Sequence, residues 1–255
     1  MSVSSYVIGD VHGCARQLDD LIGQIRSDLQ NNDRIIFLGD LIDGGPDSKG
    51  AVEQVVQLRA ELGADRVPVI QGNHEEWLLA SHADFHRSSW LFSMNGLSTV
   101  QSYSDDAAFN LRTSVRSRMT ARITISGKRM DRELPYQPFF DAMPPEHLDL
   151  LTQGLVDYVE DENVIAVHSK CDPAVSLAEQ DPKDLRWGNP EELLATWKGP
   201  KQVVVGHTPT WKIDPDKRGH PILTEAVACI DTSPDTTGIL TCVRFPDQKV
   251  YQAGG

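Results

Sequence analysis

The chain has few cysteines, no long apolar run and little positive charge. Its four cysteines are scattered over 255 residues without CxxC spacing, which disfavours a structural zinc site or a thioredoxin-like centre. No apolar stretch is long enough to span a bilayer, and a first strand starting by about Ser5 leaves no room for a secretory signal. We therefore expect a cytoplasmic protein with no membrane partner.

The balance of charges excludes another class of protein. The chain carries 24 Lys and Arg against 37 Asp and Glu, for a formal net charge of -13. General affinity for nucleic acid needs clustered cations that release counterions from the phosphate backbone. The sequence therefore predicts no nucleic-acid partner. A chain of 255 residues can bury a full core without disulfides, so we expect a single domain over residues 1–255.

Five short apolar runs lead into residues that can bind a metal. Branched or aromatic residues followed by glycine or by the ligand itself predict buried strands that enter tight loops. In open α/β sheets, ligands bind outside the carboxyl ends of the strands. The runs are SSYVIGDVHG (4–13), RIIFLGDLIDGG (34–45), VPVIQGNHEE (67–76), VIAVHS (164–169) and VVVGHT (203–208). The side chains expected to converge are Asp10, His12, Asp40, Asp43, Asn73, His74, His168 and His207.

Helical patterns separate the first three runs. Apolar residues recur at helical spacing over residues 14–29 and 48–62, and Ser48 and Gly63 are the predicted N-cap and C-terminal stop of the second helix. This alternation of strand and helix predicts a layered α/β fold. Residues at about 77–160 have few strand-like runs and predict a mainly helical insertion. Within it, a basic run at 114–132 surrounds a predicted hairpin, ARITISGKRM; we interpret the run as a solvated face, with attraction of a phosphorylated substrate as the alternative.

The expected donor set favours divalent metal chemistry. Carboxylate, amide and imidazole ligands without thiolates suit manganese foremost, with iron, zinc or nickel as alternatives. One carboxylate bridging two ions would hold them ~3.5 to 4 Å apart, the spacing used in two-metal phosphoester hydrolysis. Such a pair makes hydroxide available near neutral pH and withdraws charge from the phosphoryl oxygens. A histidine held by a carboxylate outside the metal set is the natural general acid, and His74 with Asp43 fits that description.

The order and spacing of the motifs resemble those of a known family. GDVHG, GDLIDGG, GNHE, a later VH and VGHT are similar to the motifs GDxHG, GDxxDRG, GNHE, H and GH of the phosphoprotein phosphatase family of calcineurin-like metallophosphoesterases. The similarity runs from Ile8 to about Leu240. It implies a four-layer αββα sandwich, with two mixed sheets flanked by helices and the active site at the sheet edge. It also implies a hydrolase that resembles bacterial serine/threonine protein phosphatases.

The resemblance assigns a role to each motif residue. Asp10 and His12 would bind the first metal, and Asp40 would bridge the two ions. The second metal would be bound by Asn73, His168 and His207. His74 would protonate the leaving group and Asp43 would orient it. The histidines that match no motif are predicted to be surface or core residues: His82, His86, His147 and His220.

The chain departs from the family where arginines grip the phosphate. Gly44, Gln71 and Asn189 stand where the family carries arginine. Their loss removes bidentate contacts whose geometry lysine does not reproduce. Two cations lie nearby in sequence, Lys170 and Arg186, and we predict that one or both bind the substrate instead; the alternative is that both are ordinary surface charges.

Three functions remain open at this point. The leading prediction is hydrolysis of phosphomonoesters, with a phosphorylated protein or a small phosphorylated molecule as the substrate. The second is hydrolysis of dinucleoside polyphosphates of the diadenosine tetraphosphate (Ap4A) type, for which aromatic residues would stack the bases. The third is a catalytically weak phospho-binding protein. The aromatic candidates, predicted mostly as core, are Trp77, Trp90, Phe92, Tyr103 and Tyr136.

Overall fold

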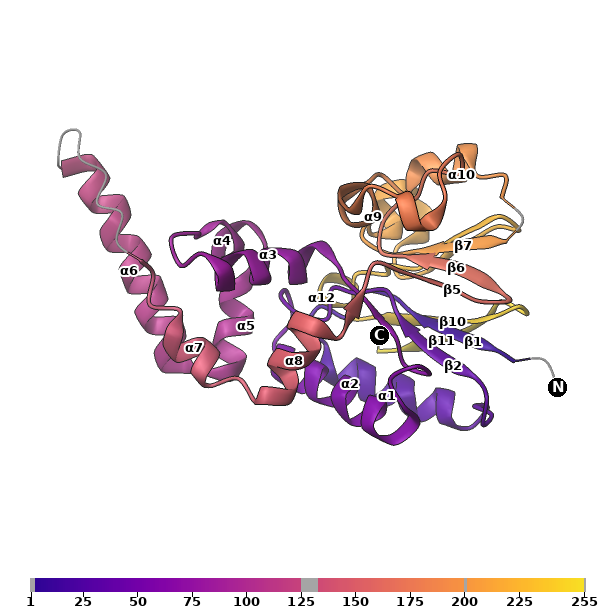
Figure 1. Ribbon diagram of the computed structural model, residues 1–255, viewed down its shortest axis with the longest axis horizontal. Coiled ribbons are helices and arrows are strands. Elements are labelled where there is room, and N and C mark those ends of the chain that lie inside the picture. The colour runs from indigo at the N-terminus through magenta and orange to yellow at the C-terminus, as the bar shows by residue number, and fades with distance from the viewer. Residues whose placement is uncertain (1–2, 125–132, 200, 255) are drawn as a thin grey trace.

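Two β-sheets are stacked face to face (Figure 1). The computed structural model describes residues 3–124, 133–199 and 201–254. Within these ranges, one sheet has the order β11-β10-β1-β2-β3-β4 and the other the order β5-β6-β7-β9-β8. The strands are β1 (Ser5–Ile8), β2 (Arg34–Phe37), β3 (Val69–Ile70), β4 (Leu155–Val156), β5 (Tyr158–Glu160), β6 (Val164–Val167), β7 (Gln202–Val205), β8 (Ile222–Leu223), β9 (Val227–Cys229), β10 (Leu240–Phe245) and β11 (Lys249–Ala253).

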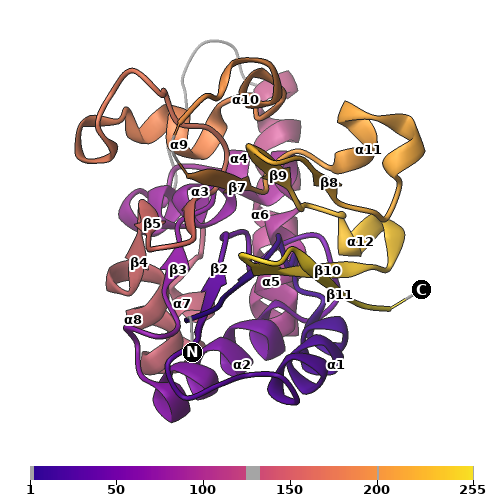
Figure 2. The same cartoon turned by 90° about the vertical axis from the view of Figure 1, so that its right-hand side faces the viewer.

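Helices cover the outer face of each sheet, which confirms the predicted four-layer αββα sandwich (Figure 1). The first sheet is covered by α1 (Ala15–Arg26) and α2 (Ser48–Leu62), and the second by α9 (Pro182–Trp187) and α10 (Glu191–Thr196). Two short helices, α11 (Thr210–Ile213) and α12 (Pro234–Thr237), lie in the C-terminal third. In Figure 2, α11 and α9 lie on opposite sides of the molecule.

Three hydrophobic cores lie between the four layers. In β2, Ile35 and Phe37 pack with the residues of α1 and α2, whereas Ile36 packs with residues of the facing sheet. In β7, Val204 points into the core between the sheets, and its neighbours point toward α9 and α10. Because successive side chains of a strand point to opposite faces, strands covered on both sides must be apolar at every position. This explains the continuous apolar runs in the sequence.

Parallel pairing brings the five ligand-bearing loops to one edge of the sandwich. In the first sheet, β1 pairs with β2 and β2 with β3, all parallel. In the second, β6 pairs with β7 in parallel. The loops that follow these strands therefore leave from the carboxyl ends of both sheets. Strand order thus fixes where the predicted ligands meet, as expected for open α/β sheets.

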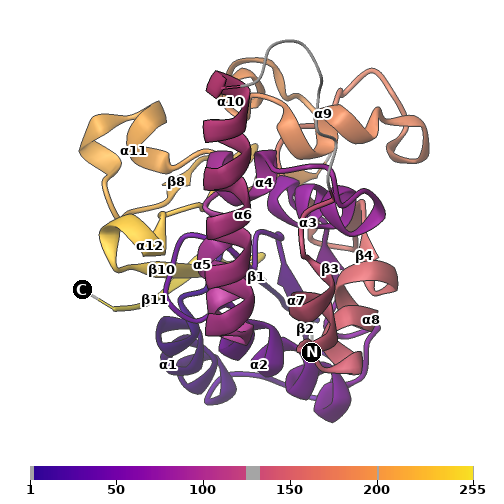
Figure 3. The ribbon, with the colours of Figure 1, turned by 90° about the vertical axis from the view of Figure 1, so that its left-hand side faces the viewer.

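A helical region separates β3 from β4. Its helices are α3 (Asn73–Ala83), α4 (Ser89–Ser93), α5 (Gly96–Tyr103), α6 (Asp105–Thr124), α7 (Gln137–Asp141) and α8 (Pro145–Gln153). Figure 1 shows α6 extending away from the two sheets, and Figure 3 shows it from the side, in front of them. The predicted hairpin is wrong in its first part, because residues 121–124 continue α6; the rest of ARITISGKRM lies outside the described residues. Asp105 and Asp106 in the first turn favour the start of this helix through its dipole.

The cap of α2 differs from the prediction. Asp47, not Ser48, is the N-cap, and its carboxylate accepts a hydrogen bond of 2.8 Å from Gly50 N. Ser48 is instead the first helical residue, and its hydroxyl accepts from the backbone N–H of Asp43 at 3.1 Å. The helix ends at Gly63 as predicted, where φ is 96°. Among the described helices, none has the length and apolar character needed to cross a membrane.

Removing the cap of α2 should destabilise the fold measurably. We expect Asp47→Ala to lower the free energy of unfolding by about 1 kcal/mol, because one N–H at the helix start loses its acceptor. Urea denaturation followed by circular dichroism measures this change. Asp65→Ala, an exposed aspartate beyond the same helix, is the matched control and should stay within ~0.5 kcal/mol of the wild type. Equal stability of the two variants would contradict the assignment of the cap.

Candidate metal centre

The ligand-bearing loops turn sharply as they leave the strands. Four of the predicted site residues have left-handed backbone conformations: His12 (φ 46°), Asp40 (48°), Asp43 (70°) and His207 (66°). Such conformations are unfavourable for residues with a Cβ atom and persist where surrounding structure imposes them. The loops are held by hydrogen bonds, since the Asp40 carbonyl accepts from Val11 N at 3.1 Å and His12 N at 2.8 Å. The turns aim these side chains into the space between the loops.

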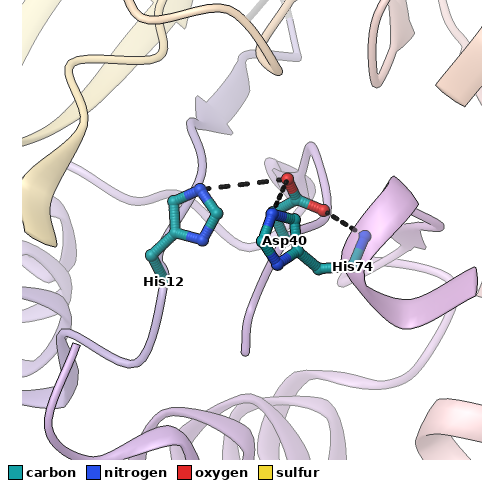
Figure 4. A group of neighbouring side chains, drawn as sticks. All are labelled: His12, Asp40 and His74. Carbon is teal, nitrogen blue, oxygen red and sulfur yellow. Dashed lines mark hydrogen bonds and ion pairs between the residues drawn. The ribbon is translucent and has the colours of Figure 1, made fainter. Parts of the chain in front are cut away.

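Asp40 lies at the centre of the cluster, with its carboxylate 2% exposed. Its Oδ2 is 3.9 Å from His12 Nε2 and 3.8 Å from His74 Nε2, and its Oδ1 accepts from His74 N at 3.1 Å (Figure 4). On its other side, Oδ2 is 3.5 Å from His168 Nε2. The imidazoles surrounding Asp40 outweigh the effect of burial and hold the pKa of its carboxyl well below the usual range.

The second half of the cluster brings several acceptor atoms together. Asn73 Oδ1 lies 2.9 Å from His168 Nε2 and 2.9 Å from His207 Nδ1. His168 donates its Nδ1–H to the Leu38 carbonyl at 2.8 Å, and burial lowers its pKa, so the ring is neutral and Nε2 carries a lone pair. Burial likewise lowers the pKa of His207 to about 4. A neutral Nε2 that faces the oxygens of Asn73 and Asp40 has no proton to share with them. A cation satisfies all of these atoms together.

Asp10 adds a carboxylate that lacks a full set of partners. Its Oδ2 accepts from His207 N at 2.9 Å, but its buried Oδ1 has no hydrogen-bond partner among the described residues. Burial, followed by the charges of Asp231 and Asp40, raises the pKa of Asp10. A Cβ at Gly206 would lie 2.0 Å from Oδ1, so only glycine leaves room for this carboxylate. The donor set of the whole cluster therefore fits divalent cations, with Asp10 beside the loop that holds Gly206 and His207, and Asn73 beside His168.

His74 and Asp43 form the predicted acid pair. His74 Nδ1 lies 2.8 Å from Asp43 Oδ2. Asp43 also accepts from Trp90 Nε1 at 2.9 Å and from Thr99 Oγ1 at 2.5 Å, which fixes its orientation. Burial lowers the pKa of His74, but the charge of Asp40 and the hydrogen bond to Asp43 outweigh burial and raise it to about 9. His74 Nε2 is turned toward the cluster, 3.8 Å from Asp40 Oδ2.

The sequence motifs did not predict the residues that hold the site loops in place. Glu75 is buried, and its carboxylate accepts from Asp40 N at 2.9 Å, Leu41 N at 2.8 Å and Gly72 N at 3.1 Å. It therefore ties the Asp40 loop to the start of α3. Its place as the last residue of GNHE, three residues after the glycine, was the available signal because that spacing is typical of a capping box. Asp231, a buried carboxylate beyond β9, has an Oδ2 with no partner among the described residues.

Trp90 and Thr99 come from the helical region, about fifty residues from Asp43 in sequence. Trp90 is fully buried, and Thr99 Oγ1 also accepts from the Asp43 backbone N–H at 2.9 Å. Nothing in a local motif predicts contacts at that separation. The helical region therefore contributes directly to the orientation of the acid pair, through side chains on α4 and α5.

None of the residues at the three positions where the family has arginine is positively charged. A Cβ on Gly44 would lie 3.0 Å from the Asp235 carboxylate, and φ there is 77°. Asn189 is exposed, and its side chain accepts from Glu191 N at 3.0 Å. Of the predicted replacements, Lys170 is ion-paired with Glu192, and Arg186 with Asp157 at 2.5 Å. To bind a substrate, Lys170 and Arg186 would have to exchange these carboxylates for its phosphate. Their substrate-binding role therefore stays a prediction.

The remaining histidines and the cysteines lie outside the cluster. His82, His86 and His220 are exposed, and His147 is a buried core residue. Its two ring nitrogens are bonded at 2.8 Å to Tyr103 and Glu53. All four cysteines are free and buried. Burial raises the pKa of the Cys14 and Cys171 thiols to about 12, which leaves little reactive thiolate near neutral pH.

The fold and the site together define a calcineurin-like phosphoesterase. The family model described as calcineurin-like phosphoesterase matches residues 4–236, and the chain belongs to this family. This membership confirms the family resemblance that the motifs indicated. Two groups of residues that can hold a metal ion, both including Asp40, lie within the described part of the chain.

The relatives fall into two kinds of phosphohydrolase. The chain is 37% identical over 91 residues to serine/threonine-protein phosphatase 1 of Salmonella typhimurium, and it covers 38% of that protein. It is 37% identical over 95 residues to the symmetrical bis(5'-nucleosyl)-tetraphosphatase of Buchnera aphidicola, of which it covers 32%. It thus spans about a third of the length of these two relatives. To the asymmetrical bis(5'-nucleosyl)-tetraphosphatase PrpE of Oceanobacillus iheyensis it is 25% identical over 254 residues, covering 95% of this chain and 89% of that one.

Solved structures show the same fold. The crystal structure of a protein proposed to be a diadenosine tetraphosphatase matches all of this chain and 95% of its own, with a TM-score of 0.62 and 20% identity. A serine/threonine phosphatase from Saccharomyces cerevisiae matches 99% of this chain and 80% of its own, with a TM-score of 0.54 and 14% identity. At these identities the likeness supports the αββα architecture and leaves the substrate open.

Replacing the central carboxylate should weaken metal binding. We expect the chelator-stripped protein to bind two equivalents of Mn²⁺ in calorimetric titration, and Asp40→Asn to weaken binding of both at least tenfold, because the shared ligand loses its charge. Metal at 100 times its Kd should stabilise the wild type by about 2.7 kcal/mol. His86→Gln, which removes an exposed histidine, is the control. Wild-type binding by Asp40→Asn would refute the bridging role.

Proposed function

We propose that the protein is a metal-dependent phosphoesterase that hydrolyses phosphomonoesters at a dinuclear centre. In this proposal, the ligands of one ion are Asp10, His12 and Asp40, and those of the other are Asp40, Asn73, His168 and His207. The observation that carries it is the convergence of neutral imidazole lone pairs and oxygens around Asp40, since Asn73 Oδ1 lies 2.9 Å from two imidazole nitrogens. Manganese is the ion we propose, because the donors are oxygen and nitrogen atoms.

The residues of the chain divide the chemistry between them. Two bound divalent ions would supply a nucleophile at neutral pH and withdraw charge from the phosphoryl oxygens. Asp40, whose Oδ2 lies 3.9 Å from His12 Nε2 and 3.5 Å from His168 Nε2, would be the ligand that both ions share. His74 donates its proton to the leaving-group oxygen through Nε2, while Asp43 holds Nδ1 and so fixes the direction of the ring. Trp90 and Thr99 keep Asp43 in place, so the acid is aligned before the substrate arrives.

The substrate proposal has a second candidate, hydrolysis of dinucleoside polyphosphates. A tetraphosphatase relative covers 95% of this chain, whereas the matched part of the protein phosphatase relative covers 36%. The chain also lacks the family arginines, which indicates that its grip on the substrate differs. A phospho-binding protein with little turnover, the third prediction, is disfavoured because the acid pair is fully assembled. We propose a cytoplasmic location, since all four cysteines are free thiols and reducing compartments keep them so.

Removing the general acid should slow catalysis without removing the metals. We expect His74→Asn to lower kcat for p-nitrophenyl phosphate by ~10² to 10⁴, because the leaving oxygen loses its proton donor. Steady-state kinetics with added Mn²⁺ and elemental analysis of bound metal measure the two effects separately. His220→Asn, an exposed histidine, should retain wild-type kinetics. Full activity in His74→Asn would remove this residue from the acid role, and no turnover by the wild type would sink the enzyme proposal.

The two cations near the site can be tested as replacements for the missing arginines. If Lys170 or Arg186 contacts the substrate phosphate, its change to Ala should raise KM for p-nitrophenyl phosphate about tenfold, the size expected for a hydrogen bond to a charged group. Lys198→Ala is the control, since Lys198 is an exposed lysine just beyond the end of α10. Unchanged KM and kcat in both variants would leave Lys170 and Arg186 as ordinary ion-paired surface residues.

A further inference from the structure

A groove lies between α3 and α9, beside the proposed metal centre. Figures 2 and 3 show these two helices side by side, although they are about a hundred residues apart in sequence. The groove has a volume of about 370 Å³, within the range of small-molecule sites. It is lined by Glu76, Trp77, Ala80, Arg87, Lys183 and Trp187.

Two tryptophans form its apolar wall. The ring centroids of Trp77 and Trp187 are 5.6 Å apart, with the ring planes at 45°. Trp187 Nε1 donates to Glu76 Oε2 at 2.5 Å, which fixes the orientation of its ring. Both rings are only half-buried, and Ala80, one turn along α3 from Glu76, leaves space in front of them. The wall therefore presents fixed aromatic surface to a ligand.

The groove adjoins the ligands of the second metal. The ring centroid of Trp187 is 6.3 Å from that of His207. Trp77 is four residues after Asn73 on α3, so the two side chains lie on one face of the helix. A molecule seated on the tryptophans is thus one ring away from the proposed site of phosphoryl transfer.

Charged groups complete the lining. Arg87 and Lys183 supply two cations in a chain whose formal net charge is -13. Arg87 makes only a long contact of 3.7 Å with Asp84, and within the described ranges the Lys183 ammonium has no ion-pair partner. The Glu76 carboxylate accepts from Trp187 and keeps lone pairs for a further donor. Flat aromatic walls, a hydrogen-bond acceptor and nearby cations suit a base joined to a sugar and phosphates.

We propose that this groove binds the base of a purine nucleotide substrate, stacked on Trp77 and Trp187, while its phosphates reach the metal centre. The inference rests on the proposed function and favours its second candidate, which is hydrolysis of a phosphoanhydride that joins two nucleosides. Lys183 and Arg87 contact phosphates that point away from the metals, and Glu76 accepts from a ribose hydroxyl or a base amino group.

Binding can be tested without turnover. Adenosine has no phosphate to be cleaved, and ribose lacks the base, so the pair isolates stacking. Adenosine should quench the tryptophan fluorescence of the manganese-loaded protein in a saturable manner, and ribose should not. Trp77→Ala should weaken adenosine binding at least ~5-fold, because a base stacked on an aromatic ring contributes that much or more. Trp187→Phe, which keeps an aromatic face, should bind more tightly than Trp187→Ala. Trp211→Leu on the distant α11 is the control and should bind as the wild type does.

Selectivity supplies the second readout. The ratio of kcat/KM for diadenosine tetraphosphate to that for p-nitrophenyl phosphate should fall at least ~5-fold in Trp77→Ala. It should stay at the wild-type value in Trp211→Leu. A ratio that is the same in both variants would overturn the groove as a substrate site.

The failures of the two proposals are distinguishable. If the wild type hydrolyses neither compound but adenosine still quenches, the catalytic proposal fails and the groove stands. If p-nitrophenyl phosphate is hydrolysed but adenosine does not quench, the groove proposal fails alone. A phosphoserine peptide that quenches where adenosine does not would assign the groove to protein substrates and overturn the nucleotide proposal.

Discussion

The arrangement of the site depends on one buried carboxylate. Asp40 is almost fully enclosed, and a charge in that position is costly unless it is compensated. Three imidazole nitrogens lie within 3.9 Å of its Oδ2. These rings come from three different loops, and burial lowers the pKa of His168. A buried carboxylate surrounded by imidazole nitrogens suits a shared divalent cation, which would compensate its charge.

The two stacked sheets hold the loops that surround Asp40. The ligands of the first proposed ion come from loops of the first sheet, whereas His168 and His207 follow β6 and β7 of the second. The ligands proposed for the second ion come from both sheets, since Asn73 follows β3 of the first. The core between the sheets, with Ile36 and Val204 among its residues, therefore fixes the distance between the two halves of the cluster. Close packing of that core transmits small changes in side-chain volume to the ligand geometry.

The sequence predicted the layers and the ligand positions because these depend on local patterns. Apolar runs marked the doubly covered strands, and glycine and ligand residues marked the loops after them. The cap at Asp47 was missed because two adjacent polar residues both suit that position. The hairpin predicted at 121–130 was wrong in its first part. The alternating β-branched residues there favour a strand locally, but residues 121–124 continue α6. Contacts such as Trp90 to Asp43, or Trp77 to Trp187, join distant segments and leave no mark on a local pattern.

The start of α3 places four separate tasks on five successive residues. Asn73 is a proposed ligand, His74 the acid, Glu75 the tie to the Asp40 loop, and Glu76 and Trp77 line the groove. An α-helix turns by roughly 100° per residue, so successive side chains point toward different parts of the molecule. Inserting or deleting one residue in this turn would reassign all five directions at once. The proposed chemistry and the lining of the groove therefore depend on the same helical turn, and a substitution is the change that can alter one of them without rotating the others.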